Sequence, residues 1–211
     1  MAVRIGILGA GNMAVALGGK WARAGHDVLI GARSAERAEV SAKSIGARAG
    51  TFAEAAGHGE AVLSAVGHAA TGEVIPPLAE LLAGKALLDC SNPMVPGPSG
   101  LVLTTDGGPS AARTLADAAP GAHVVKAFHL GAAGVWAGEH ANGLGVPLCG
   151  DDADALAVAH TLVADVGSVP LAVGGLERAG YLEATAAIVI GMWFADQDPR
   201  TMLPAAEHAH G

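Results

Sequence analysis

Hydrophobic and polar positions along the chain group into short apolar runs separated by longer mixed segments. The short runs predict buried strands at residues 3–8, 26–30, 61–66, 85–90 and 123–128. The mixed segments predict helices at residues 13–24, 34–45, 71–82 and 109–119, the third limited or kinked by Pro76-Pro77. Strands and helices that alternate at this spacing form parallel sheets with right-handed crossovers. The first 128 residues are therefore expected to form one α/β domain.

The pattern changes after residue 128. Residues 129–140 are rich in glycine and mix polar with apolar side chains. Strands are then expected at 146–150 and 169–173, and helices at 151–166 and 181–195, of which the second helix is strongly apolar. We predict that residues 129–211 form a smaller C-terminal α/β lobe appended to residues 1–128.

The first strand leads directly into a glycine-rich turn, Gly9-Ala10-Gly11-Asn12-Met13-Ala14. In this G-x-G-x-x-A pattern the first glycine permits a tight turn, and the second lets the backbone approach a pyrophosphate. The small residue Ala14 lets the following helix pack closely on the strand. The N–H groups at the start of that helix would hold the pyrophosphate. Because the turn joins a strand to a helix, it indicates a Rossmann-type, doubly wound, mainly parallel fold rather than a structural turn alone.

The end of the second strand indicates which dinucleotide would bind. A site for NAD usually has a carboxylate there, which holds the adenosine ribose. This chain has Arg33 and Ser34 instead, with Arg37 about one helical turn further on. A guanidinium and a hydroxyl at a helix start suit a 2′-phosphate, so NADP is the expected cofactor. The alternative is that Ser34 only caps its helix and the arginines are ordinary surface residues.

Charge and hydropathy exclude several other classes of protein. The chain of 211 residues has a net charge of −8 and no basic cluster interleaved with aromatic residues. Nucleic acid and anionic membrane surfaces are therefore not expected partners. The longest apolar stretch, Ala184–Ala195, is about twelve residues and too short to span a membrane.

Cysteine and histidine spacing argues against a metal centre. Cys90 and Cys149 form neither a metal-binding pattern nor a C-x-x-C motif, and we expect two free buried thiols in a cytoplasmic protein. In the tail 207–211, His208 and His210 have no further ligands at workable spacing, so no metal site is expected there.

Five segments occur in a fixed order: the turn at 9–14, Gly31–Ser34, Asn92–Pro96, Val124–His129 and Val146–Asp152. Together they resemble the NADPH-dependent reductases of coenzyme F420, a deazaflavin. The similarity covers nearly the whole chain, and the run V-P-L-C-G-D-D is its most specific part. Two departures concern the second ligand. Val66-Gly67 stands where relatives often have Pro-Trp, and Gly180 stands where they often have Arg.

The resemblance implies a role for each matching residue. The pyrophosphate loop would be Gly9, Ala10, Gly11, Asn12, Met13 and Ala14, and the 2′-phosphate pocket Arg33, Ser34 and Arg37. Further cofactor contacts would come from Val66, Gly67, His68 and Asn92, and from Pro93, Met94 and Val95 in the turn beside the nicotinamide. The second-substrate pocket, completed by the C-terminal lobe, would contain His129, Leu130 and Gly131, with His129 as an orienting group.

The chemistry implied by the resemblance is direct hydride transfer between the nicotinamide and the deazaflavin ring. The cofactors carry the reactivity, so the protein has to stack two rings and keep water out. His68 and His129 would then orient or hydrogen-bond a ring, the alternative being a merely structural role for each.

Two other functions stay open. One is an NADPH-dependent reductase of a small imine, carbonyl or ferric substrate. The other is a non-catalytic NADP-sensing module, which would need a blocked nicotinamide mouth, whereas residues 92–96 and 129–131 look open and mixed. Because the apolar helix 181–195 needs cover on more than one side, we also predict a homodimer.

Overall fold

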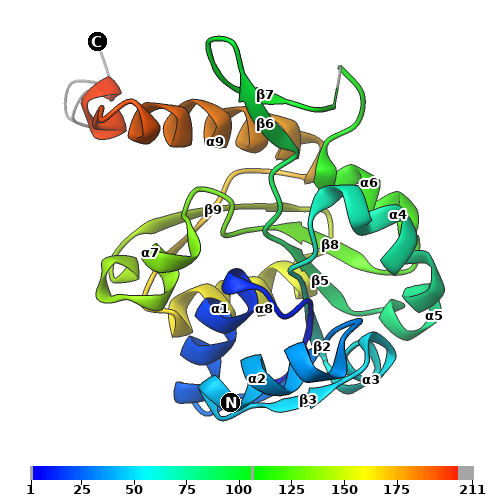
Figure 1. Cartoon of the computed structure of the whole chain (residues 1–211). Coiled ribbons are helices and arrows are strands. Elements are labelled where there is room, and N and C mark those ends of the chain that lie inside the picture. Colours follow the sequence, from blue (N-terminus) through cyan, green and yellow to red (C-terminus); the bar gives the residue numbers. More distant parts are fainter. Residues whose placement is uncertain (1, 106, 204–211) are drawn as a thin grey trace.

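One sheet of eight strands organises the computed structural model, which describes residues 2–105 and 107–203 (Figure 1). The strand order is β10-β9-β8-β5-β4-β1-β2-β3. The strands are β1 (Arg4–Leu8), β2 (Asp27–Gly31), β3 (Arg48–Gly50), β4 (Ala61–Ser64), β5 (Ala86–Asp89), β8 (His123–Lys126), β9 (Gly145–Gly150) and β10 (Val169–Ala172). The sheet is parallel except between β8 and β9, which confirms the predicted mainly parallel α/β fold.

Helices cover both faces of the sheet (Figure 1). The α-helices are α1 (Asn12–Arg23), α2 (Ala35–Ile45), α3 (Phe52–His58), α4 (Thr71–Val74), α5 (Ala79–Leu82), α6 (Ala111–Ala118), α7 (Ala133–Ala137), α8 (Ala153–Asp165) and α9 (Ala179–Phe194). Short 3-10 turns lie at His68–Ala70, Pro76–Leu78, Glu139–Ala141, Leu176–Arg178 and Pro199–Met202.

The hydrophobic core consists of two layers, one on each side of the sheet. Residues alternate along β1, so that Ile5 and Ile7 face the layer containing α1, whereas Leu8 faces the layer containing α3. In the first layer Phe128 makes edge-on contacts with Trp21 and Trp136, at ring centroid distances of 6.0 and 5.3 Å. Alanine and aliphatic side chains dominate both layers, as expected for a chain with only 3% aromatic residues.

The C-terminal strands extend the same sheet. Val125 of β8 pairs with Gly150 of β9, and β10 then pairs parallel to β9. The division of the chain into residues 1–128 and 129–211 remains a prediction. The strands that flank this boundary, β8 and β9, are hydrogen-bonded neighbours in one sheet. The apolar stretch 181–195 is helix α9 as expected, whereas the tail 207–211 lies outside the described residues.

Several elements differ from the sequence-based expectation. The helix expected at 71–82 is split into α4, a 3-10 turn and α5, because Pro76 and Pro77 cannot continue an α-helix. The segment expected as a turn after β5 instead enters a hairpin of β6 (Met94–Gly97) and β7 (Gly100–Leu103). Strand β3 and helices α3 and α7 lie in stretches for which no element was expected.

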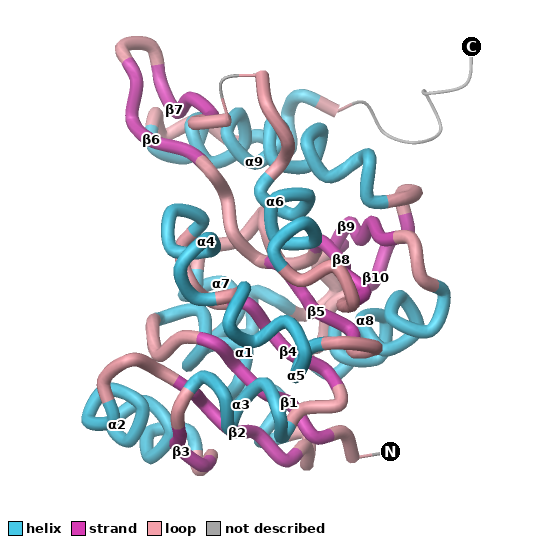
Figure 2. Tube along the Cα trace, turned by 90° about the vertical axis from the view of Figure 1, so that its right-hand side faces the viewer, coloured by secondary structure: helices cyan, strands magenta, loops and turns pink. Residues whose placement is uncertain are grey.

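The hairpin β6–β7 packs against α9 at one end of the molecule (Figures 1 and 2). Figure 2 shows both elements extending away from the edge of the sheet where β5 and β8 end. Tyr181, Ile188 and Phe194 of α9 are exposed, whereas Glu183 of the same helix is buried. Within residues 2–105 and 107–203 there is no helix of the length and hydrophobicity needed to cross a bilayer.

Candidate functional site

The turn after β1 depends on two glycines with different surroundings. Gly9 has a φ of +124°, and a Cβ atom built there would lie 2.7 Å from the carbonyl oxygen of Ala65. Only glycine fits that position, as the tight turn of the fingerprint requires. A Cβ on Gly11 would meet no atom within 4 Å. Gly11 is the N-cap of α1 and no side chain caps that end, so open space lies over the start of the helix.

A cavity of about 410 Å³ lies next to this turn, at the carboxyl ends of β1, β2 and β4. It is lined by Gly9, Ala10, Gly11, Ala32, Arg33, Ser34, Arg37, Phe52, Ala65, Val66, Gly67 and Ala70. The fold thus brings together the glycine turn and the residues predicted for the 2′-phosphate. Ligands of open α/β sheets bind at this edge.

The charged part of the lining is cationic. Ser34 caps α2, and its Oγ accepts a hydrogen bond from the main-chain N–H of Arg37 at 3.3 Å. Arg33 is exposed, and its Nη1 atom lies 3.5 Å from Oε1 of Glu73, which is also exposed. The lining residues include two arginines and one serine but no carboxylate, in the part of the chain that the structure describes. The cavity therefore favours a phosphate over a bare ribose.

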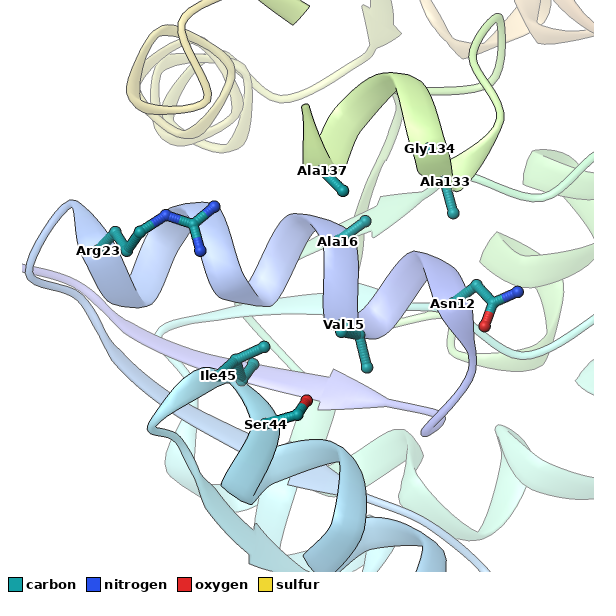
Figure 3. A pocket seen from close by; sticks show the side chains of 9 residues that line it. All are labelled: Asn12, Val15, Ala16, Arg23, Ser44, Ile45, Ala133, Gly134 and Ala137. Carbon is teal, nitrogen blue, oxygen red and sulfur yellow. The ribbon is translucent and has the colours of Figure 1, made fainter. Parts of the chain in front are cut away.

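The other three residues of the fingerprint point elsewhere. Ala14 is fully buried in the core, and Met13 is partly buried against it. Asn12 lines a separate groove of about 460 Å³ between α1, α2 and α7, shown in Figure 3. The walls of this groove are mostly alanine and aliphatic side chains, with Arg23 at one end.

A second group of polar residues lies at the ends of β5 and β8. Asn92 follows β5, and its Nδ2 donates a hydrogen bond to the main-chain carbonyl of His129, at 2.7 Å. Asn92 Oδ1 and both ring nitrogens of His129 are buried and lack a hydrogen-bond partner within the described residues. The Nδ1 atom of His68 is in the same situation. Buried polar atoms are nearly always hydrogen-bonded, so these atoms call for a polar partner, either a bound ligand or an ordered water.

His129 is held as a neutral side chain. Burial, together with the positive charge of Lys126, lowers the pKa of His129 to about 3, although the Asp89 carboxylate opposes this shift. The preceding residue, Phe128, has a φ of +58° and is packed between two tryptophans. A non-glycine residue rarely adopts this conformation, and such strain is often found at functional sites.

The remaining predicted residues have mixed surroundings. Thr104 donates both its N–H and its hydroxyl to the carbonyl of Pro93, at 2.7 and 3.0 Å, which fixes the start of the hairpin. Met94 and Val95 lie in β6, where Val95 is half exposed. Leu130 is partly exposed, but Gly131 is buried beneath Trp136, which donates to its carbonyl at 2.8 Å. The segment 129–131 is thus more enclosed than its composition suggested.

One feature of this region was missed in the sequence. Lys126 of β8 is completely buried and forms ion pairs with Asp89 and with Glu183 of α9, at 2.8 and 2.9 Å. Two signals in the sequence could have indicated buried charges. They are a lysine within the apolar segment 123–128 and a glutamate within the apolar helix expected at 181–195.

The cysteines are free and buried, as predicted. Burial raises the pKa of each thiol to about 12, so neither is a ready nucleophile at neutral pH. Among the residues that the structure describes, no three His, Cys, Asp or Glu side chains are grouped in a way that could hold a metal ion.

Comparison with known proteins agrees with this geometry. Residues 4–93 match the sequence model of the family described as "NADP oxidoreductase coenzyme F420-dependent". The metalloreductase STEAP3 of Rattus norvegicus is 30% identical over 193 residues, which are 91% of this chain. The chain spans only 38% of that relative's length.

Solved structures show the same architecture. A candidate F420-dependent NADP-reductase from Arthrobacter sp. FB24 superposes with a TM-score of 0.83 at 25% identity, over 92% of this chain and 95% of that one. A reductive aminase from Aspergillus terreus, solved with NADPH and ethyl-5-oxohexanoate, gives a TM-score of 0.67 at 22% identity, over 93% of this chain and 64% of that one. The second likeness concerns the fold alone. Residues 4–93 thus match the sequence of the "NADP oxidoreductase coenzyme F420-dependent" family, and the first of these structures shares its fold with nearly the whole chain.

Proposed function

We propose that this NADP oxidoreductase transfers a hydride between NADP(H) and the deazaflavin coenzyme F420. The observation that carries the proposal is the cavity in which the glycine turn, Arg33, Ser34 and Arg37 share one wall. The family description and the name of the Arthrobacter relative support the deazaflavin as the second ring.

The adenosine half of NADP(H) fits the lining of this cavity. The space above Gly11 would take the pyrophosphate at the start of α1, where main-chain N–H groups and the helix dipole favour negative charge. Arg33, Arg37 and the Ser34 hydroxyl would hold the 2′-phosphate. Glu73, which pairs with Arg33, would compete weakly with that phosphate because both side chains are exposed.

The nicotinamide half fits the polar atoms at the ends of β5 and β8. Asn92 Oδ1 would accept a hydrogen bond from the carboxamide N–H, since the amide nitrogen of Asn92 is already used by His129. The bound nicotinamide would supply the hydride at its C4 atom, and the proton that reduction of the deazaflavin also consumes would come from solvent. His129, with its low pKa, would act as a neutral hydrogen-bonding group that orients a ring.

The test is direct. The protein, NADPH and oxidised F420 are mixed, and the visible absorption band of the deazaflavin is followed. Bleaching that requires both the protein and NADPH is the expected result. Control reactions replace F420 with a ferric chelate, because one relative is a metalloreductase, or with a cyclic imine. Turnover with either of these, and none with F420, would favour the alternative reductase function.

We further propose that the protein is a homodimer formed through α9. Tyr181, Ile188 and Phe194 are large apolar side chains exposed on that helix, and Val102 of the adjoining hairpin is half exposed. Large exposed apolar surface often marks an interface. A second copy of the chain would bury it.

A further inference from the structure

Lys126 is the centre of a buried cluster of charges at the ends of β5 and β8. Its Nζ atom lies 2.8 Å from Asp89 Oδ2 and 2.9 Å from Glu183 Oε1, and it also donates to the main-chain carbonyl of Ser91. The side chains of all three charged residues are at most 2% exposed. Burial alone would lower the pKa of Lys126, but the two carboxylates outweigh burial and raise it, so the lysine stays charged.

The cluster holds both main-chain groups of Ser91. While Lys126 bonds the carbonyl, Asp89 Oδ1 accepts the N–H of Ser91 at 2.9 Å. The next residue is Asn92, whose side chain bonds the carbonyl of His129. A continuous set of contacts therefore joins Lys126 to Asn92 and His129, two of the three residues in the described part of the chain whose buried polar atoms lack partners.

Glu183 connects the same cluster to two helices. Its Oε2 and Oε1 atoms accept the N–H groups of Ala111 and Ala112, at 3.0 and 3.2 Å, in the first turn of α6. One ammonium and two carboxylates leave the cluster with one net negative charge, which the start of α6 favours. Apolar residues of similar size often stabilise a fold as well as a buried ion pair does, so stability alone is a weak explanation for this arrangement.

We propose that Lys126 is a positioning residue of the reaction, which fixes Ser91 and thereby sets Asn92 Oδ1 and the His129 ring where a nicotinamide carboxamide would lie. The identity of that ligand rests on the proposed function; the positioning of the two side chains does not.

Two variants test the proposal. Lys126→Met removes the ammonium but leaves two buried carboxylates, and this protein can fail to fold. The double variant Lys126→Met with Asp89→Asn keeps the net charge of the cluster at −1 and keeps an acceptor for the Ser91 N–H. Lys85→Met is the matched control, because Lys85 bonds the carbonyls of Ala56 and Gly57 at 2.6 and 3.3 Å, away from both cavities described above.

The first measurement compares the affinities for NADP⁺ and for adenosine 2′,5′-bisphosphate, which lacks the nicotinamide. In the double variant the bisphosphate should bind within about twofold of wild type, whereas NADP⁺ should lose about three- to tenfold, the equivalent of one misplaced hydrogen bond. Lys85→Met should lower the melting temperature without changing the ratio of the two affinities.

The second measurement is amide hydrogen exchange without any ligand. Exchange should become faster at Ser91–Asn92 and at His129–Leu130 in the double variant, and not at Gly9–Ala14. An unchanged affinity ratio together with unchanged exchange at these residues would overturn the proposal. If the wild-type protein bound neither nucleotide, the proposed function would fail, and the exchange data would still decide whether Lys126 positions Asn92 and His129.

Discussion

The side-chain amide of Asn92 donates to the main-chain carbonyl of His129, with 2.7 Å between nitrogen and oxygen. This bond joins the ends of β5 and β8 and fixes which way the amide faces. Its Oδ1 atom and the His129 ring nitrogens therefore remain as buried groups that can bond a ligand. Substituting His129 can therefore show whether this residue orients a bound ring or transfers a proton.

Substituting His129 should slow hydride transfer without a histidine-like pH profile. His129→Ala should lower the rate about severalfold to tenfold, because one orienting contact is worth about 0.5–1.5 kcal/mol. His129→Asn should keep much of the activity, since it can donate from a similar position. Single-turnover kinetics between pH 5.5 and pH 8 would show this as a flat profile for wild type. A rate that titrates within that range would contradict the neutral role.

The low pKa of His129 also predicts how stability depends on pH. The folded protein keeps His129 neutral down to about pH 3, whereas the unfolded chain takes up a proton near its ordinary value of 6.5. Stability from this residue is therefore fully present above pH 6.5 and decreases as the pH falls toward 3, by up to about 1.4 kcal/mol per pH unit. Urea unfolding at pH 7, 6 and 5 should show a weaker decrease in His129→Asn. Parallel curves for the two proteins would rule this out.

The two glycines of the first turn should respond differently to alanine. Gly11→Ala should change the free energy of unfolding by less than about 1 kcal/mol, because its Cβ meets no atom and its φ of −92° suits alanine. It should weaken NADPH binding at least about tenfold, since the added methyl occupies the space proposed for the pyrophosphate. Gly9→Ala should instead destabilise the fold by more than about 1 kcal/mol. Thermal unfolding and fluorescence titration with NADPH distinguish the two effects, and tight NADPH binding by Gly11→Ala would place the pyrophosphate elsewhere.

Arg33→Ala should weaken NADPH binding by about ten- to hundredfold and hardly affect NADH, because a charge-assisted bond to phosphate is worth about 1.5–3 kcal/mol. Glu73→Gln should strengthen NADPH binding by less than about fivefold, because it removes an exposed competitor of the phosphate. Arg48→Ala is the control, since Arg48 pairs with Asp27 at 2.9 Å and does not line the cavity. Titration calorimetry gives all three affinities. Equal affinity of the wild-type protein for NADPH and NADH would refute the phosphate pocket.

Ile188→Glu combined with Phe194→Glu should convert a dimer into a monomer at micromolar concentration, because both side chains are exposed on α9 and a charge there would be buried in the interface. Val40→Glu on α2 changes an equally exposed apolar residue and should leave the dimer intact. Light scattering measures the mass. A monomeric wild-type protein would show that α9 has no second copy as its partner.

The sequence predicted the part of the fold whose causes are local. Apolar runs marked the strands, and the φ of Gly9 and the cap of Ser34 follow from residue types at fixed spacing. Helix α3 could also have been found, because Thr51 and Glu54 form a capping box that is visible as T-x-x-E. The hairpin after Pro93 could not, because Pro96 and Gly97 are typical of turns, and the segment is a strand through its pairing with β7, which packs on α9. The pairing of Lys126 with Glu183 was equally inaccessible, since it depends on how α9 docks.

The pairing of β5 with β8, and of β8 with β9, has a consequence for dissecting this chain. The family match ends at residue 93, between β5 and β6, yet β5 is an internal strand whose other neighbour is β8. A fragment ending at residue 93 would expose one edge of β5 and leave Asp89 without its ion-pair partner Lys126. A fragment ending at residue 128 would leave Lys126 without its second partner, Glu183. Exposed strand edges promote aggregation. The recognisable nucleotide-binding sequence is therefore not a module that can be excised and grafted, and engineered fusions of this protein have to retain the chain through α9.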